Sequence, residues 1–282
     1  MSKAPIEAIA FDCFGTLIDF DDAAFARAYG QICGEQGLSV DNQAFFDKWM
    51  EVWQRPSPAA PAATLTNRPG PLSEPLAAPA PSSLVASATR RLDGPPPPFQ
   101  PYREDWPPHF AICFRELGLA GDAAVASERL RQILGAAPAY PEARRVVETV
   151  GRRLPIAMMS NADNDFLLPS LARNGLAFPV VISSEDVEVY KPHVAVFEAL
   201  VAALGVAAAN VLYVGDSRTA DVAGAKNAGL RAAWLNRNGL DYHAGAAGGR
   251  RRFEPDYELA SLDGLLDIIE DGNAAGGDRV TA

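Results

Sequence analysis

The chain has 282 residues, of which 48% are hydrophobic and 21% charged, so it is long enough to bury a large hydrophobic core. Its 35 acidic residues outnumber its 25 lysines and arginines, which gives a formal net charge of −10 at pH 7. A surface this negative repels nucleic acids and anionic lipids, and so argues against a partner of either kind. The first apolar run is short and interrupted by acidic residues, so we expect neither a signal peptide nor a membrane anchor.

The cysteines say something about the compartment. Cys13, Cys33 and Cys113 are far apart in the chain, and none belongs to a CxxC pair. This usage favours neither a disulfide framework nor a zinc site, and it suits a reducing compartment. We therefore expect a cytoplasmic protein, and the sequence leaves open whether it is a monomer or a homodimer.

The first apolar run, residues 6–11, predicts a buried strand that ends at Asp12. Apolar residues at helical spacing then predict helices over 21–37, 43–53, 109–117 and 123–134. These four helices come before the next predicted strand. They therefore form a large insertion after the first turn.

Residues 56–101 differ from the rest of this insertion, because they hold 13 of the chain's 23 prolines. Proline lacks a backbone N–H group, so the stretch can form neither a long helix nor a paired strand. We expect a disordered or polyproline-II loop at about 56–98 that serves as a variable linker within the insertion.

The second half of the chain alternates between helix and strand. Helices are predicted over 141–154, 194–204 and 221–228, and strands over 156–159 and 211–214. Continuous apolar strands that alternate with helices are typical of a parallel sheet with both faces covered. The sequence therefore predicts an α/β fold. The glycine- and alanine-rich tail, 271–282, is expected to fray.

Polar residues follow each of the three predicted strands directly. They are Asp12 with Gly15 and Thr16 after the first strand, Ser160 and Asn161 after the second, and Asp216 with Asp221 after the third. Open α/β sheets bind their ligands beyond the carboxyl ends of the strands. We therefore expect these three polar turns to lie side by side at one edge of the sheet.

Taken singly, most of these residues have an ordinary structural explanation. Asp12, Ser160 and Asn161 are of types that often cap helices, and a lone lysine such as Lys191 is usually solvated. Two acids placed together are harder to explain in this way, since their carboxylates repel each other unless a cation offsets the charge. The pair formed by Asp216 and Asp221 therefore favours a bound Mg²⁺ ion.

The order of these residues along the chain resembles the haloacid dehalogenase superfamily of hydrolases. The resemblance is carried by Asp12 with Thr16, by Ser160-Asn161, by Lys191-Pro192 and by Gly215-Asp216 with Asp221. It implies a Rossmann-like parallel sheet core with an α-helical cap inserted after the first strand. Residues 1–18 and 141–270 would then form the core and residues 19–140 the cap.

The resemblance also implies a role for each of these side chains. Asp12 would be the nucleophile that forms a covalent aspartyl intermediate, and Lys191 would neutralise charge on it and on the group under attack. Thr16 or Ser160 would hold the transferring group, with Asn161 beside it. The implied metal ligands are Asp12, the backbone carbonyl of Phe14, Asp216 and Asp221.

Phe14 departs from the phosphatase pattern of this superfamily. Most such phosphatases carry a second aspartate two positions after the nucleophile, where it serves as general acid and base. The loss of a general acid costs a factor of about 10²–10⁴ in rate when the leaving group needs a proton. The 2-haloacid dehalogenases of the superfamily have an aromatic residue there, because a halide leaves without protonation. Phe14 therefore favours dehalogenation.

The acid pair favours the opposite assignment, because those dehalogenases replace it with neutral residues and need no metal. Without a cation, Asp216 and Asp221 would raise the pKa of the nucleophile. No arginine soon after Asp12 is placed to hold a substrate carboxylate, and Arg27 is the nearest. The sequence thus favours Mg²⁺-dependent hydrolysis of a small anionic phosphorylated substrate. An (S)-2-haloacid dehalogenase is the alternative, and a slow or inactive binding module is the third hypothesis.

Overall fold

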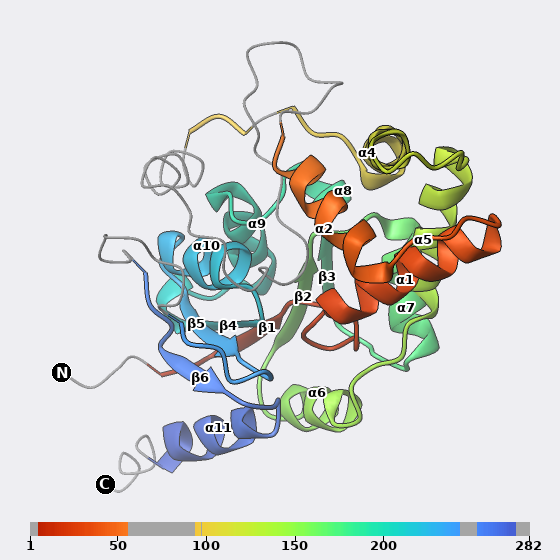
Figure 1. Cartoon of the computed structure of the whole chain (residues 1–282). Helices are drawn as coiled ribbons and strands as arrows, with labels where there is room; N and C mark the ends of the chain where they lie inside the picture. The colour runs from red at the N-terminus through yellow and green to blue at the C-terminus, as the bar shows by residue number, and fades with distance from the viewer. Residues whose placement is uncertain (1–4, 56–93, 97, 243–252, 275–282) are drawn as a thin grey trace, which may run out of the picture.

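A six-stranded parallel sheet forms the centre of the molecule (Figure 1). The computed structural model describes residues 5–55, 94–96, 98–242 and 253–274. The strand order is β3-β2-β1-β4-β5-β6, and every pair of neighbouring strands is parallel. The strands are β1 (Ala8–Phe11), β2 (Ile156–Ser160), β3 (Val180–Ser183), β4 (Val211–Gly215), β5 (Arg231–Leu235) and β6 (Tyr257–Leu259).

The three strands predicted from the sequence are β1, β2 and β4, and they are neighbours in the sheet. Ile9 pairs with Ile156 of β2 on one side and with Leu212 of β4 on the other. The α/β fold class and the adjacency of the three polar turns are thereby confirmed. Strands β3, β5 and β6 were not predicted, because they are short or begin in charged or half-exposed residues.

Side chains of alternate strand residues point to opposite faces of the sheet. Ile9 and Phe11 pack into one hydrophobic cluster, whereas Ala8 and Ala10 pack into the other. Figure 1 shows α9 and α10 above the sheet and α6 and α11 below it. The helices of the sheet region are α6 (Ala143–Gly151), α7 (Asn164–Arg173), α8 (Ser184–Val187), α9 (Val194–Leu204), α10 (Gly224–Asn227) and α11 (Gly264–Ala274), with short helical turns η1 (Ala208–Asn210) and η2 (Arg218–Ala223).

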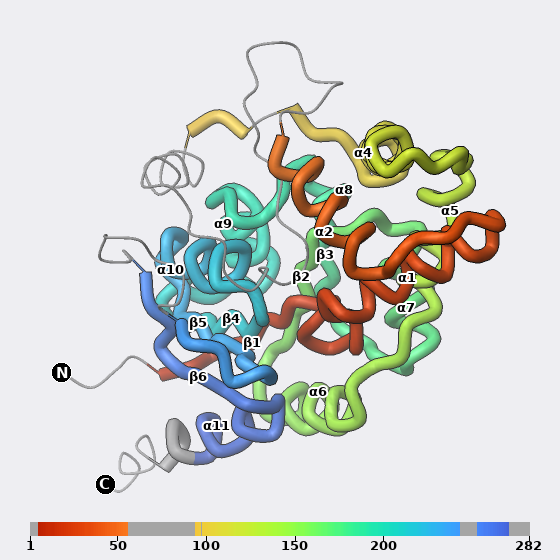
Figure 2. Tube along the Cα trace, viewed as in Figure 1, coloured from red at the N-terminus to blue at the C-terminus, as the bar shows by residue number. Residues whose placement is uncertain are grey.

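Four further helices, which we call the insert helices, lie together on one side of the sheet (Figure 2). They are α1 (Asp22–Glu35), α2 (Asn42–Trp53), α4 (Tyr102–Glu116) and α5 (Ala123–Ala136). An aromatic core joins α1, α2 and α4, in which five pairs among the rings of Tyr29, Phe45, Trp49 and Phe110 have centroids between 4.8 and 6.0 Å apart.

The two chain segments that join the insert helices to the sheet lie side by side. Ile18 pairs with Ala139, the Asp19 N–H donates to the Pro138 carbonyl at 2.8 Å, and the Tyr140 N–H donates to the Leu17 carbonyl at 2.9 Å. These bonds fall next to the boundaries expected at residues 18 and 140. The division into a core and a cap stays a prediction, and nearly all of the proline-rich stretch at 56–98 lies outside the described residues.

Three predicted elements differ from those in the structure. Helix α4 begins at Tyr102 rather than at residue 109, so that Pro107 and Pro108 lie inside it. The helix predicted over 221–228 is divided into the π-helical turn η2 and the short helix α10. Helix α11 runs to Ala274, so the first four residues of the predicted tail are helical, and residues 275–282 lie outside the described part.

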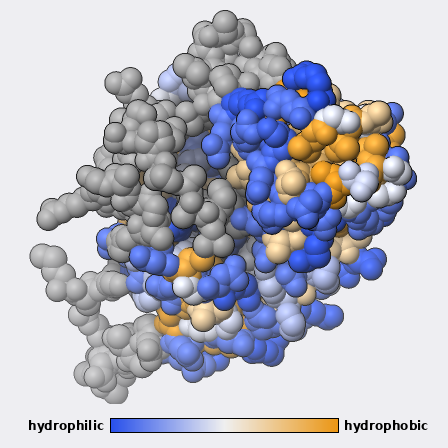
Figure 3. Space-filling view, in the orientation of Figure 1, coloured by the Kyte–Doolittle hydropathy of each residue, from blue (hydrophilic) through white to orange (hydrophobic). Residues whose placement is uncertain are grey.

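The described residues form a mostly polar surface on the face in view (Figure 3). An apolar patch lies in the area where Figure 1 draws α4 and α5, and Val125 of α5 is 53% exposed. Within the described residues, the helices are all too short or too polar to span a lipid bilayer.

Candidate active site

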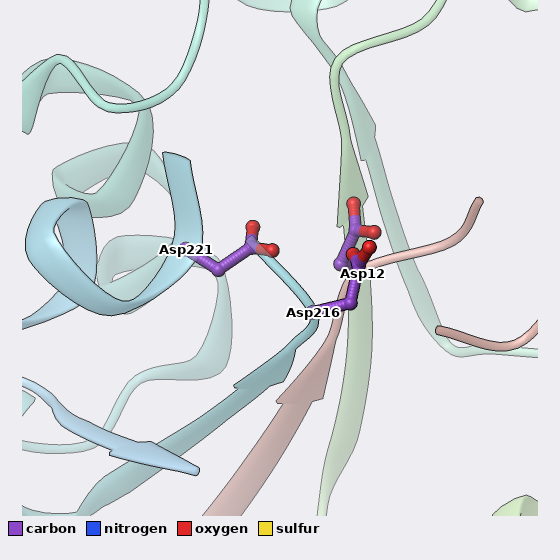
Figure 4. A group of neighbouring side chains, drawn as sticks. All are labelled: Asp12, Asp216 and Asp221. Atoms are coloured by element: carbon purple, nitrogen blue, oxygen red, sulfur yellow. The ribbon is translucent and has the colours of Figure 1, made fainter. Parts of the chain in front are cut away.

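The candidate site lies where β1, β2 and β4 end (Figure 4). Asp12 follows β1, Ser160 is the last residue of β2, and Asp216 follows β4. Asp221 comes from η2 and points toward the other two carboxylates (Figure 4). The sheet order places β1 between the other two strands, so Asp12 is central in this group.

Lys191 is the cation that joins the three turns. Its Nζ donates to Asp12 Oδ1 at 2.6 Å, to Asp221 Oδ1 at 2.6 Å and to the Tyr213 hydroxyl at 3.0 Å. Burial favours the neutral amine, but the carboxylates of Asp12 and Asp221 outweigh it and raise the pKa of Lys191 well above its usual value. The lysine is therefore a fixed positive charge beside Asp12.

The two oxygens of the Asp12 carboxylate have different surroundings. Oδ1 accepts from Lys191 Nζ and, at 3.4 Å, from the Ser160 hydroxyl. Among the side-chain donors of the described residues, Oδ2 has one long contact, 3.3 Å from the Thr16 hydroxyl, which lies at a similar distance, 3.4 Å, from Asp216. A hydroxyl has a single proton to donate, so it serves only one of these carboxylates at a time. Oδ2 is thus the less engaged oxygen of Asp12.

Asp12, Asp216 and Asp221 each offer an oxygen atom, and these atoms lie within 4.8 Å of one another. Burial and the charge of Asp221 raise the pKa of Asp12 to about 6, although Lys191 lowers it. Burial, Asp12 and Asp221 raise the pKa of Asp216 well above its usual value. Without further positive charge, this site disfavours the ionised forms of Asp12 and Asp216.

The donor set fits a small hard cation such as Mg²⁺, which prefers carboxylate oxygens. Asp221 is held on both sides, because its Oδ1 accepts from Lys191 and its Oδ2 accepts from the Ser217 N–H at 2.9 Å. Asp216 is less constrained, since among the side chains of the described residues its carboxylate accepts only from the Thr16 hydroxyl, at 3.4 Å. Asp12 and Asp216 are therefore the residues with oxygens left to offer.

Two glycines leave the space that the acids occupy. A Cβ atom on Gly15 would lie 2.5 Å from Asp216 Oδ2, and one on Gly215 would lie 2.3 Å from the Asp221 side chain. Gly15 also has a φ of +82°, in the region that L side chains rarely adopt. The turn after β1 and the end of β4 thus require glycine for the carboxylates to come together.

The sequence did not specify which residues the side chains of Asn161 and Phe14 contact. The Asn161 amide donates to the Lys191 carbonyl at 3.2 Å, and its oxygen accepts from the Lys191 N–H at 2.8 Å. It therefore fixes the backbone of Lys191 instead of contacting Asp12. The Phe14 ring is fully buried and packs against Phe20 and Phe166, and the role of its carbonyl as a metal ligand stays a prediction.

A small cavity of about 30 Å³ lies beside Asn161 and Phe14. Aromatic side chains from the insert helices line it, including Tyr29, Trp49 and Trp106. The tryptophans of the insert are buried as well, so they belong both to the core and to the cavity wall. No local pattern in the sequence distinguishes these two roles.

Sequence reasoning missed two residues that support the site. Tyr213 accepts from Lys191 and donates to the Met159 carbonyl at 2.9 Å, which holds the lysine between β2 and β4. Asp163, fully buried, accepts from the N–H groups of Tyr102 and Arg103 at 2.9 and 2.8 Å and so caps α4. Burial raises the pKa of Asp163 to about 6, although these two backbone donors lower it.

Comparison with known proteins gives a consistent result. A protein-family model described as haloacid dehalogenase-like hydrolase matches residues 6–229. The phosphoserine phosphatase of Thermus thermophilus is 36% identical over 126 residues, which are 41% of this chain and 51% of that protein. The (S)-2-haloacid dehalogenase of Pseudomonas sp. strain YL is 30% identical over 158 residues, which are 55% of this chain and 65% of that protein. The chain thus spans about half to two thirds of these relatives.

Solved structures show the same fold at low identity. The HAD-hydrolase YfnB from Bacillus subtilis, bound to magnesium, has a TM-score of 0.67 at 19% identity, with 94% of this chain and 99% of that chain covered. The L-2-haloacid dehalogenase from Xanthobacter autotrophicus has a TM-score of 0.65 at 23% identity, with the same two coverages.

Proposed function

Because the chain belongs to the haloacid dehalogenase-like hydrolases, whose family model covers residues 6–229, we propose that this hydrolase cleaves a phosphate ester of a small molecule. Asp12 serves as the nucleophile, and Mg²⁺ is the cofactor. The substrate is a small anion. The chain resembles both a phosphatase and a dehalogenase. The residues of the candidate site must therefore decide which of the two reactions is proposed.

The acid cluster is the observation that carries this proposal. Three carboxylates lie within 4.8 Å of one another, and of these three the ammonium group of Lys191 contacts those of Asp12 and Asp221 but not that of Asp216. A divalent cation would add the positive charge that such a cluster needs in order to ionise fully. Halide displacement needs a single charged nucleophile and gains nothing from Asp216, whereas phosphoryl transfer is the type of reaction that uses such a cation.

The geometry of the side chains suggests how the first step proceeds. Asp12 attacks phosphorus with Oδ2, because Lys191 and Ser160 hold Oδ1. A P–O bond to Asp12 forms, the P–O bond to the leaving alcohol breaks, and the electron pair goes to the leaving oxygen. Water then attacks phosphorus, which releases inorganic phosphate and restores the Asp12 carboxylate.

The surrounding residues bind and neutralise the transferring group. Lys191 stays charged and stabilises negative charge on Asp12 and on the phosphoryl oxygens. The hydroxyls of Thr16 and Ser160 flank the Asp12 carboxylate and bind those oxygens. Asn161 acts through Lys191, whose backbone it holds. Asp12, Asp216, Asp221 and the Phe14 carbonyl would hold Mg²⁺, which would supply electrostatic stabilisation of the phosphoryl group.

Hydrolysis of 4-nitrophenyl phosphate and of 2-chloropropionate, each with Mg²⁺ and with EDTA, tests this function. We expect phosphate release that needs Mg²⁺ and that disappears in Asp12→Asn. Chloride release that is insensitive to EDTA would contradict the proposal. Asp47→Asn is the matched control. Asp47 is an exposed residue of α2, and the substitution also removes one negative charge, at a position distant in sequence from the polar turns.

Dehalogenation is the second candidate, and the side chain of Phe14 favours it. This ring is buried beside the cavity, at a position where a phosphatase would use an acid to protonate its leaving group. The two reactions differ in the second step, because an ester intermediate on Asp12 is hydrolysed at the Asp12 carbonyl carbon. A single turnover in ¹⁸O-labelled water would then place the label in Asp12, whereas attack at phosphorus places it in phosphate. If neither substrate reacts, the result favours the third hypothesis, a slow or inactive binding module.

A further inference from the structure

The cavity beside the candidate nucleophile has an unusual lining. Eight of its ten lining residues are aromatic, and the other two are Leu134 and Asn161. The lining residues, all within the described part of the chain, include no lysine, arginine, histidine or acid. Two of the lining residues are close in sequence to the candidate site: Phe14 lies two positions after Asp12, and Asn161 follows Ser160, whose hydroxyl lies 3.4 Å from Asp12.

This lining disfavours a charged substrate group. A carboxylate or ammonium that entered the cavity would lose its water and meet no opposite charge among the lining residues. The named substrates of the phosphoserine phosphatase and of the (S)-2-haloacid dehalogenase both carry a carboxylate. The cavity of this chain therefore suits a group that those relatives' substrates do not have.

The arrangement of the rings favours a flat group over an aliphatic one. The rings of Tyr102 and Trp106 are stacked at 4.6 Å, and Trp106 is stacked on Phe166 at 5.7 Å. Parallel aromatic faces attract another ring beyond the effect of burial alone. The rings that line the cavity belong to four helices, α1, α2, α4 and α7, together with Phe14, so the wall is assembled from segments that are far apart in the sequence.

Phe14 links the cavity to the chemistry at Asp12. Phe14 lines the cavity and has no proton to donate, so a leaving oxygen that lies beside it would receive no proton from this residue. An aliphatic alkoxide is a poor leaving group under these conditions. A phenol or enol oxygen is far more acidic, and it is attached to the kind of flat, uncharged group that the cavity fits.

We propose that the substrate is the phosphate monoester of an uncharged aromatic alcohol, whose ring lies among Phe14, Trp106 and Phe166 while its phosphate faces Asp12. This inference rests on the proposed phosphohydrolase function. The cavity of about 30 Å³ holds only one or two water molecules, so the ring enters as the aromatic side chains separate. Trp49, Trp53 and Trp106 are three of the chain's 4 tryptophans, and their fluorescence reports this separation.

Binding of the product alcohol tests the cavity without any turnover. We expect 4-methylphenol to give a saturable change in tryptophan fluorescence, and 4-hydroxybenzoate, of similar shape but charged, to bind at least about tenfold more weakly. Equal binding of the two compounds, or no saturable change with 4-methylphenol, overturns the inference. Because no phosphate is cleaved in this experiment, its result does not depend on whether the protein is a phosphohydrolase.

Turnover separates the effect of the cavity from that of leaving-group acidity. The carboxylate of 4-carboxyphenyl phosphate makes its phenol more acidic than that of 4-methylphenyl phosphate, so acidity alone predicts faster hydrolysis. The cavity predicts the opposite order in kcat/KM, with the difference mainly in KM. Trp106→Leu should reduce this preference and Trp106→Phe should restore it. An unchanged preference in a folded Trp106→Leu variant, or faster hydrolysis of the charged ester, contradicts the inference.

Discussion

Replacement of the candidate nucleophile by its neutral isostere should stabilise the metal-free protein. Burial and Asp221 raise the pKa of Asp12 from its usual 3.8 to about 6, and a tenfold change in proton affinity corresponds to about 1.4 kcal/mol. The ionised side chain thus costs the fold about 3 kcal/mol at pH 7. Asp12→Asn removes this cost, while Lys191 keeps its bond to Asp221. We expect a higher free energy of unfolding together with a complete loss of turnover.

The raised pKa of Asp12 also predicts how the difference in free energy of unfolding between Asp12→Asn and wild type depends on pH. Because the folded-state pKa of Asp12 is raised, its contribution to stability is fully present below about pH 4 and is lost as the pH rises through about 6. Urea unfolding of wild type and Asp12→Asn in EDTA should therefore give similar free energies at pH 4 and diverge toward pH 7. A variant that is no more stable than wild type at pH 7, or a gap that does not change with pH, would refute this reasoning. Asp47→Asn should show no such divergence.

Three further substitutions test other parts of the site. Asp216→Asn should abolish the rise in melting temperature that Mg²⁺ produces in the wild type, because the cluster loses its least constrained carboxylate; an undiminished rise would exclude this residue as a ligand. Gly15→Ala should lower the free energy of unfolding by about 1–3 kcal/mol, since its Cβ would lie 2.5 Å from Asp216 Oδ2 on a backbone with positive φ; urea unfolding measures this, and a neutral effect would show that the turn can rearrange. Asp163→Ala should speed amide hydrogen exchange at Tyr102 and Arg103, which lose their acceptor; unchanged exchange would mean that water replaces the carboxylate without loss.

The centre of the site was predictable because its signals are local. Each of the strands β1, β2 and β4 is a short apolar run followed at once by polar residues. The rule that ligands bind beyond the carboxyl ends of parallel strands then places Asp12 beside Asp216 without any knowledge of the intervening chain. The structure brings these residues together, and their chemical roles stay proposals.

The supporting residues were not predictable, because their partners are distant in sequence. Asp163 caps a helix that begins 61 residues earlier, and no spacing rule relates the two. Helix α4 begins at Tyr102, earlier than predicted, and contains Pro107 and Pro108, although a proline donates no hydrogen bond within a helix. The aromatic cavity draws on five separate segments, in which each ring alone is a normal core residue.

The covalent intermediate on Asp12 can be tested directly by the mass of the peptide that contains this residue during turnover. An acid quench of the protein with excess 4-nitrophenyl phosphate and Mg²⁺ traps an acyl phosphate before water can hydrolyse it. We expect the Asp12 peptide to gain the mass of one phosphoryl group, and this gain to be absent with EDTA and in Asp12→Asn. An unmodified Asp12 peptide in a sample that is releasing phosphate, or an ester on Asp12 after turnover of 2-chloropropionate, would contradict the proposed function.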